Sequence, residues 1–157
     1  MNQISCFEST HGNVVYDALH ECLSIQGNVI ADGANTHIQS ITIFSKTVVV
    51  VFDDADLHGK SVADSYVDKR KGNIVCYSME EKPRVLWRID DLCAEQIHLP
   101  FCAGHSVTLQ EQLSWSKWHD VEFQRNHEYF LALNYGGGKY LIDVTAAQLL
   151  KIVYSKD

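Results

Sequence analysis

Two runs of β-branched and apolar residues follow one another in the first half of the chain, at residues 38–44 and 47–52. Only Ser45 and Lys46 separate them, so the two runs are predicted to form a β-hairpin. The second run contains four consecutive valines followed by Phe52, without the alternation of apolar and polar residues that a half-exposed strand has. We therefore expect this strand to be covered on both of its faces.

A second hairpin is predicted at residues 73–78 and 84–89, because two apolar runs flank a short polar stretch that contains a proline. In the second run, Val85, Trp87 and Ile89 occupy every other position. This alternation is typical of a strand that has one face in the core and the other in water. We expect these three side chains to point into the core.

The C-terminal region is predicted to be a meander of three strands, at residues 129–135, 139–144 and 149–154. Three successive glycines separate the first two strands and provide the positive φ angles that a tight reversal requires. The second connection contains Thr145 and Gln148, whose spacing also fits the start of a helix. We favour a turn there, since β-branched and aromatic residues follow.

Helical patterns are fewer. A helix is predicted at residues 13–24, where apolar residues recur at helical spacing and Gly27 lies just past the end. A second is predicted at residues 109–117, because Thr108 and Glu111 have the spacing of a capping box. The apolar positions of the first helix are Val15, Leu19 and Cys22.

Strands outnumber helices, so the fold class is predicted to be mainly β: an antiparallel sandwich, or a strongly curved sheet of hairpins, with one or two short helices. The polar stretch 53–72 is expected to be irregular, with one helical turn at residues 61–67. With 157 residues, 46% of them hydrophobic, and no linker-like stretch, residues 1–157 are predicted to be a single domain. The longest apolar run, at residues 48–52, is far shorter than the roughly 20 residues that span a bilayer.

Acidic residues outnumber basic ones by 20 to 13, which gives a net charge of -7. This balance disfavours direct binding of nucleic acid, because such binding depends on neutralising phosphates. Negative charge is concentrated in residues 53–68 and 90–128, which carry -4 and -5. It has two interpretations: a solvated surface that maintains solubility, or a face that steers a basic partner. The candidate partner-binding residues are Asp53, Asp54, Asp56, Asp64, Asp68, Asp90, Asp91 and Glu95.

The N-terminal sequence predicts a reducing compartment. The first residues contain no basic segment followed by an apolar stretch, so no secretory signal is expected and the protein is predicted to be cytoplasmic with reduced thiols. Of the five cysteines, Cys22, Cys76 and Cys93 lie among apolar neighbours and are expected in the core.

Two patterns suggest a metal-binding site, and neither is complete. Four residues of zinc-binding type lie within thirteen positions, but their spacing matches no common zinc motif. A calcium loop that starts at Asp54 requires a glutamate at its twelfth position, where the chain has Ser65. No metal and no cofactor are therefore predicted. The four residues of zinc-binding type are Cys93, His98, Cys102 and His105.

Patterns for catalysis are equally sparse. The chain has no Gly-x-Ser-x-Gly motif and no phosphate-binding loop. A thiolate at Cys102, activated by His105 or His119, is the one conceivable nucleophile. Trp115 and Trp118 share one face of the predicted helix, and we expect them in the core rather than on a binding surface.

A family resemblance adds a candidate function. The paired strands at residues 72–78 and 84–90, the valine-rich strand before them and the strand at residues 140–144 resemble small bacterial immunity proteins of contact-dependent growth inhibition and related polymorphic toxin systems. The resemblance covers residues 38–154 and consists of size, acidity and strand pattern. It implies a cytoplasmic protein that binds and neutralises a cognate toxin domain.

The leading hypothesis is a non-enzymatic immunity protein that binds a nuclease toxin through its acidic residues. Carboxylates suit this role because they can occupy the basic surface that a nuclease presents to phosphates. Two alternatives remain open. One is a small β-rich hydrolase that depends on a metal or on Cys102 and His105, and the other is a protein-interaction module of another kind.

Overall fold

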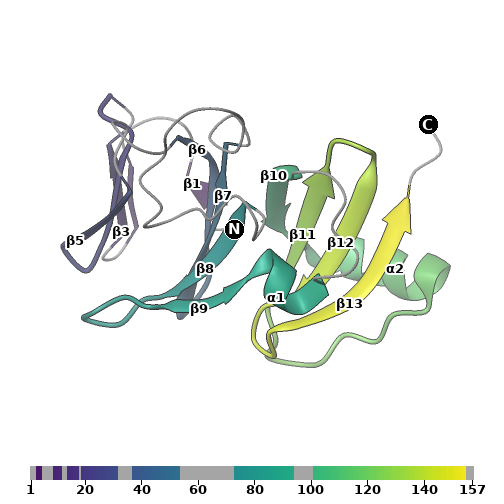
Figure 1. Ribbon diagram of the computed structural model, residues 1–157. Coiled ribbons are helices and arrows are strands. Elements are labelled where there is room, and N and C mark those ends of the chain that lie inside the picture. Colours follow the sequence, from purple (N-terminus) through teal and green to yellow (C-terminus); the bar gives the residue numbers. More distant parts are fainter. Residues whose placement is uncertain are drawn as a thin grey trace.

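The computed structural model describes residues 3–4, 9–11, 14–17, 19–31, 37–53, 73–93 and 101–154. Within these ranges the chain forms three antiparallel β-sheets and two helices, which confirms the predicted mainly-β class (Figure 1). Neither of these two helices has the length and apolar character needed to cross a membrane. The predicted helical turn at residues 61–67 lies outside the described residues.

The three sheets are stacked as layers (Figure 1). The outer sheet has the order β2 (Ser9–His11), β3 (Val14–Asp17), β4 (Cys22–Ile25) and β5 (Asn28–Ala31). The central sheet has the order β1 (Gln3–Ile4), β6 (Ile38–Ile43), β7 (Thr47–Phe52), β8 (Ile74–Ser78) and β9 (Val85–Arg88). The C-terminal sheet has the order β10 (Phe101–Ser106), β11 (Tyr129–Asn134), β12 (Gly138–Asp143) and β13 (Gln148–Tyr154).

Strand β7 is buried on both faces, as its unbroken apolar run predicts. Because side chains alternate along a strand, Val48, Val50 and Phe52 face the outer sheet, where they pack in one core cluster. Val49 and Val51 face the C-terminal sheet and belong to a second core cluster. One strand therefore contributes to two hydrophobic cores.

Helix α2 (Leu109–His119) covers the far face of the C-terminal sheet (Figure 1). Its start confirms the predicted capping box, since Thr108 Oγ1 accepts from the Glu111 backbone N–H and the Glu111 carboxylate accepts from the Thr108 N–H. Trp115 is buried in a third core cluster, as expected, whereas Trp118 is 70% exposed, so its expected place in the core is wrong.

The predicted helix at residues 13–24 is wrong. Its described part forms strands β3 and β4, which pair as an antiparallel hairpin. Val14 and Tyr16, two positions apart in β3, are buried, and so is Leu23, which pairs with Tyr16 across the hairpin. Val15, between the first two, is 40% exposed. Gly27 does not end a helix: Gln26 and Gly27 both have positive φ and form the two-residue turn between β4 and β5.

The two later hairpin regions are confirmed, with one difference at their edge. Strands β11, β12 and β13 form the predicted meander, and the connection before β13 is a turn in which Asp143 Oδ1 accepts from the Ala146 N–H. In β9, Trp87 is buried as expected but Val85 is 42% exposed, because β9 is an edge strand whose register shifts against β8. Ile89 is buried in the first turn of α1 (Ile89–Cys93) rather than in a strand.

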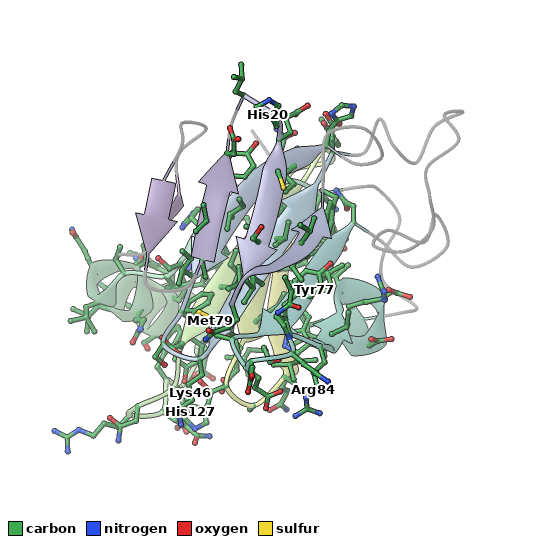
Figure 2. All side chains as sticks on the ribbon, turned by 90° about the vertical axis from the view of Figure 1, so that its left-hand side faces the viewer. His20, Lys46, Tyr77, Met79, Arg84 and His127 are labelled. Carbon is green, nitrogen blue, oxygen red and sulfur yellow. The ribbon has the colours of Figure 1, made fainter. Side chains whose placement is uncertain are left out.

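The central sheet has two distinct ends. The β6–β7 and β8–β9 turns lie together at one end, where the Met79 N–H donates to the Lys46 carbonyl. Figure 2 shows Lys46, Met79 and Arg84 at this end and His20 of the β3–β4 turn at the other. We name them the Lys46 end and the His37 end, the latter after the residue that precedes β6.

Asn73 links the central sheet to the C-terminal sheet. Its side chain is fully buried and donates from Nδ2 to the carbonyls of Phe52 and Phe101, while its Oδ1 accepts from the Phe101 N–H. Three backbone groups in two sheets are thereby satisfied by one amide. This bonding holds the start of β10 against the end of β7.

Replacing this amide is expected to be costly. Asn73→Ala leaves the Phe101 N–H and the carbonyls of Phe52 and Phe101 without the amide's bonds in a buried place, so the free energy of unfolding is expected to fall by about 2–4 kcal/mol. Urea denaturation followed by tryptophan fluorescence measures the change. Gln110→Ala, on the exposed face of α2, is the control and is expected to change stability by less than about 0.5 kcal/mol. Equal midpoints for the two variants would show that the link contributes nothing.

Candidate functional site

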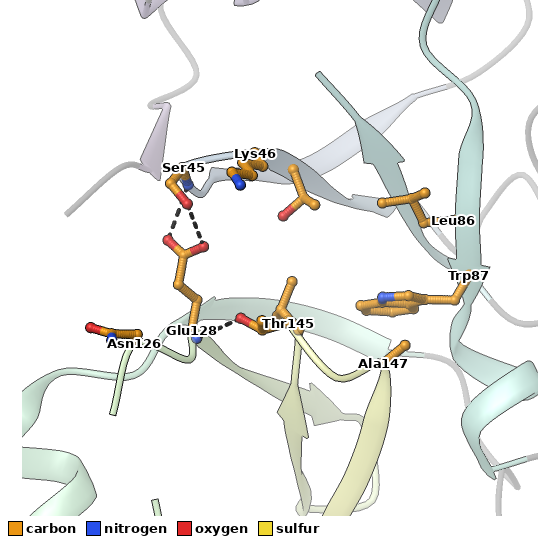
Figure 3. A pocket seen from close by; sticks show the side chains of 10 residues that line it. Ser45, Lys46, Leu86, Trp87, Asn126, Glu128, Thr145 and Ala147 are labelled. Atoms are coloured by element: carbon orange, nitrogen blue, oxygen red, sulfur yellow. Dashed lines mark hydrogen bonds between the residues drawn. The ribbon is translucent and has the colours of Figure 1, made fainter. Parts of the chain in front are cut away.

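A crevice of about 440 Å³ opens between the central and C-terminal sheets at the Lys46 end (Figure 3). Four separate segments form it: the β6–β7 turn, strand β9, the loop before β11 and the β12–β13 turn. Its lining residues are Ser45, Lys46, Thr47, Leu86, Trp87, Asn126, Glu128, Val144, Thr145 and Ala147.

A carboxylate closes one side of the crevice. Glu128 reaches from the loop before β11 to the β6–β7 turn, where Ser45 donates to it twice, from its backbone N–H at 3.0 Å and from its hydroxyl at 2.8 Å. The Glu128 backbone N–H donates in turn to Thr145 Oγ1 at 2.9 Å. Because both of its carboxylate oxygens accept from Ser45, Glu128 bridges the two sheets (Figure 3).

Trp87 forms the opposite wall. Its indole is only 4% exposed and projects between the two layers, with the nitrogen on the side that faces the hollow (Figure 3). Among the described residues, no group forms a hydrogen bond with Trp87 Nε1, although this nitrogen is buried. A buried donor without a partner in the protein is unusual and costs free energy, so an acceptor in the crevice would stabilise it.

The remaining lining is mixed. Leu86, Val144 and Ala147 give the crevice apolar walls, and Lys46 adds an exposed ammonium group at the rim. The Thr145 hydroxyl accepts from Glu128 and keeps its own hydrogen to donate. The crevice therefore combines an apolar body with several donors, a composition typical of small-molecule sites.

Sequence reasoning missed this site. Trp87 was expected as a core residue, and Ser45 and Lys46 only as a turn. The lining residues come from distant parts of the chain, and none of them forms a motif with another. The one available signal is a tryptophan in an edge strand, whose N–H needs a partner wherever the ring is buried.

The predicted acidic residues are placed in part. Asp53 is half-buried at the end of β7, and its backbone N–H donates to the His37 carbonyl. Asp90 and Asp91 lie on α1, where Asp91 Oδ2 accepts from the Arg88 N–H and caps the helix. The remaining candidates, Asp54, Asp56, Asp64, Asp68 and Glu95, lie outside the described residues.

Cys102, His105 and His119 each contact other groups. The Cys102 thiol donates to the Leu133 carbonyl, His105 Nδ1 donates to the Ser106 carbonyl, and the His119 ring packs against Trp115. Within the described residues, no hydrogen bond joins Cys102 to either histidine, and no group of three histidine, cysteine or acidic side chains has the geometry of a metal site. His98 lies outside these residues.

Two thiols are strongly shielded. Cys76 and Cys93 are buried as expected, whereas Cys22 is half-buried. Burial raises the pKa of the Cys76 thiol from 9.0 to about 12. Burial, with a smaller contribution from the Asp90 carboxylate, raises the pKa of Cys93 to about 12 as well. Both thiols therefore remain protonated and unreactive at neutral pH.

Comparison with protein-family models, curated proteins and solved structures gives no significant match to this chain.

Thiol chemistry tests the shielding. At pH 8, Cys76 and Cys93 are expected to resist alkylation by iodoacetamide in the native protein and to react fully in urea, as measured by peptide mass spectrometry. Because their pKa values are raised on folding, the stability they contribute is present below pH 9.0 and is lost as the pH rises toward about 12. Rapid native alkylation of either residue would contradict the buried placement.

A double-mutant cycle tests the bridge between the sheets. Glu128→Ala is expected to lower the free energy of unfolding by about 1–2 kcal/mol, because both Ser45 donors lose their acceptor. Ser45→Ala is expected to lower it by about 0.5–1 kcal/mol, because only the hydroxyl donor is removed. In the Glu128→Ala background, Ser45→Ala is expected to have almost no effect. An undiminished effect there would show that the two residues are not coupled in solution.

Proposed function

We propose that this protein is a non-enzymatic binding protein that neutralises a cognate toxin domain, with nuclease toxins as the preferred class, in the bacterial cytoplasm. The observation that supports this proposal is an excess of carboxylates, among the described residues, beside the strand ends on the His37 side of the central sheet. The resemblance to immunity proteins stated above points to the same function.

These groups adjoin strand ends of the central sheet. Asp53 follows β7 beside His37, and Glu21 of the β3–β4 turn contacts the His37 ring at 3.0 Å. Helix α1, with Asp90 and Asp91, follows β9 at Arg88, which pairs with Val75 near the start of β8. Glu21 thus lies on the side of the outer sheet, whereas Asp90 and Asp91 lie on the side of the C-terminal sheet (Figure 1).

The opposite end has a different charge balance. The β6–β7 and β8–β9 turns carry three cations and two carboxylates, of which Glu80 pairs with Arg84 at 3.0 Å, and Glu128 adds a third carboxylate from the C-terminal sheet. At the His37 end, the described residues carry five carboxylates and one arginine. The carboxylates are Asp17, Glu21, Asp53, Asp90 and Asp91, and the arginine is Arg88. Such an asymmetry orients a basic partner during approach.

A toxin that binds nucleic acid presents a basic cleft to phosphates, and an acidic protein surface competes for that cleft. Each exposed carboxylate contributes little by itself, since exposed ion pairs are worth about 0–1 kcal/mol. Their joint field acts mainly on the association rate. Inhibition would therefore depend on charge number at the His37 end more than on any one residue.

The test uses a candidate toxin from the genomic neighbourhood of this chain, namely the variable C-terminal domain of a secreted protein encoded beside it. The two are co-expressed in a bacterial host. Rescue of growth by the native chain is expected. The variant Asp53→Asn/Asp90→Asn/Asp91→Asn is expected to slow association about tenfold or more at low salt and to flatten its salt dependence, measured by stopped-flow fluorescence. Asparagine keeps the acceptor that caps α1.

A matched control removes the same charge elsewhere. Glu81→Gln/Asp120→Asn/Glu122→Gln neutralises three exposed carboxylates away from the His37 end and is expected to leave the association rate within about twofold. Equal slowing by both triple variants would show that only net charge matters and would remove the His37 end as the binding surface. Failure of the native chain to rescue growth or to bind would overturn the proposed function.

A further inference from the structure

The crevice at the Lys46 end is unrelated to the acidic groups of the proposed function and has the features of a second binding site. It is a hollow of about 440 Å³ between two sheets, and Glu128 fixes one of its sides by two hydrogen bonds to Ser45. A hollow of this size accepts a small organic molecule. The hydrogen bonds between Glu128 and Ser45 keep the two sheets at a fixed separation around the crevice.

Trp87 indicates which chemistry a ligand of the crevice needs. The edge of an aromatic ring carries its positive potential, and the indole N–H is the strongest donor on that edge. Its nitrogen is buried, faces the hollow and has no hydrogen-bond partner among the described residues (Figure 3). An acceptor placed in the crevice would satisfy it in a place screened from water, where a hydrogen bond is strong.

The other polar groups also favour an acceptor. The Thr145 hydroxyl and the Lys46 ammonium are donors, whereas both oxygens of Glu128 already accept from Ser45. Lys46 and Glu128 carry opposite charges, so the crevice has no net charge that would favour an ion. The walls from Leu86, Val144 and Ala147 are apolar.

We propose that this crevice binds a small neutral amphipathic molecule through a carbonyl group, which accepts from Trp87 Nε1 while the apolar part of the ligand packs against Leu86, Val144 and Ala147. The ligand class is thus an amide, ester or ketone with an aryl or branched aliphatic body. Binding there is separate from binding at the His37 end.

Phenylacetamide is a suitable probe, and ethylbenzene is its counterpart without an acceptor. The three tryptophans give three indole N–H signals in a ¹⁵N–¹H correlation spectrum. Phenylacetamide is expected to shift the Trp87 signal in a saturable manner, with a Kd on the order of 1 mM for a ligand of this size. The signal of Trp118, which is 70% exposed on α2, is expected to stay in place.

Variants separate the hydrogen bond from general packing. Trp87→Phe keeps an aromatic ring but removes the donor, and it is expected to weaken phenylacetamide binding about tenfold in ligand-observed NMR. Trp118→Phe makes the same change outside the crevice and is expected to have no effect. Leu86→Glu, at a residue 40% exposed, places a charge on the apolar wall without altering the core and is expected to abolish binding.

The proposal is overturned if no Trp87 shift saturates, if ethylbenzene binds as well as phenylacetamide, or if the Trp118→Phe variant loses as much affinity as Trp87→Phe. If Trp87→Phe fails to fold, the Leu86→Glu variant decides: unchanged phenylacetamide affinity in that variant overturns the assignment of the crevice. None of these readouts involves the toxin, so the result is independent of the proposed function.

Discussion

Every layer of this protein depends on the double burial of strand β7. A strand places successive side chains on opposite faces, so an unbroken apolar run exposes two hydrophobic surfaces at once. Val48, Val50 and Phe52 require one cover, and Val49 and Val51 require another. Residues before β7 supply the first cover as the outer sheet, and residues after it supply the second as the C-terminal sheet.

Hydrophobic contact alone leaves sheets free to slide and rotate over one another, and two polar links remove this freedom. Asn73 joins the central and C-terminal sheets from within the core, and Glu128 joins them at the Lys46 end. The buried link acts close to the His37 end and the exposed one at the rim of the crevice. Between them they determine how far apart the two layers stand, and therefore how wide the crevice is.

Local signals predicted the fold well where neighbours in sequence are also neighbours in space. The β6–β7 hairpin, the C-terminal meander and the capping box of α2 follow from residues that are a few positions apart. The failure at residues 13–24 has a physical cause: Val15 and Leu19, which gave the helical spacing, are exposed, whereas Val14 and Tyr16 are buried at the two-residue period of a strand. The positive φ values of Glu21 and Gln26 mark the reversals that the helical pattern concealed.

The candidate sites were predictable to different degrees. Acidity is a property of composition, so Asp53, Asp90 and Asp91 could be named in advance, whereas Asp17 and Glu21 could not, because their place beside His37 depends on the β3–β4 hairpin. The crevice could not be foreseen, because Ser45, Trp87 and Glu128 lie more than forty positions apart in the chain and meet only when two sheets stack. Sequence patterns describe single elements, whereas this crevice belongs to the space between them.

The order of the layers along the chain also has a consequence during synthesis. The outer and central sheets are complete once β9 has left the ribosome, but the second cover of β7 comes only from residues 101–144. At about 5–20 residues per second, several seconds pass before that segment follows. During this interval the central sheet has a solvent-exposed apolar face, which includes Val49, Val51 and Ile74. The nascent chain at that length is a natural client for a ribosome-associated chaperone.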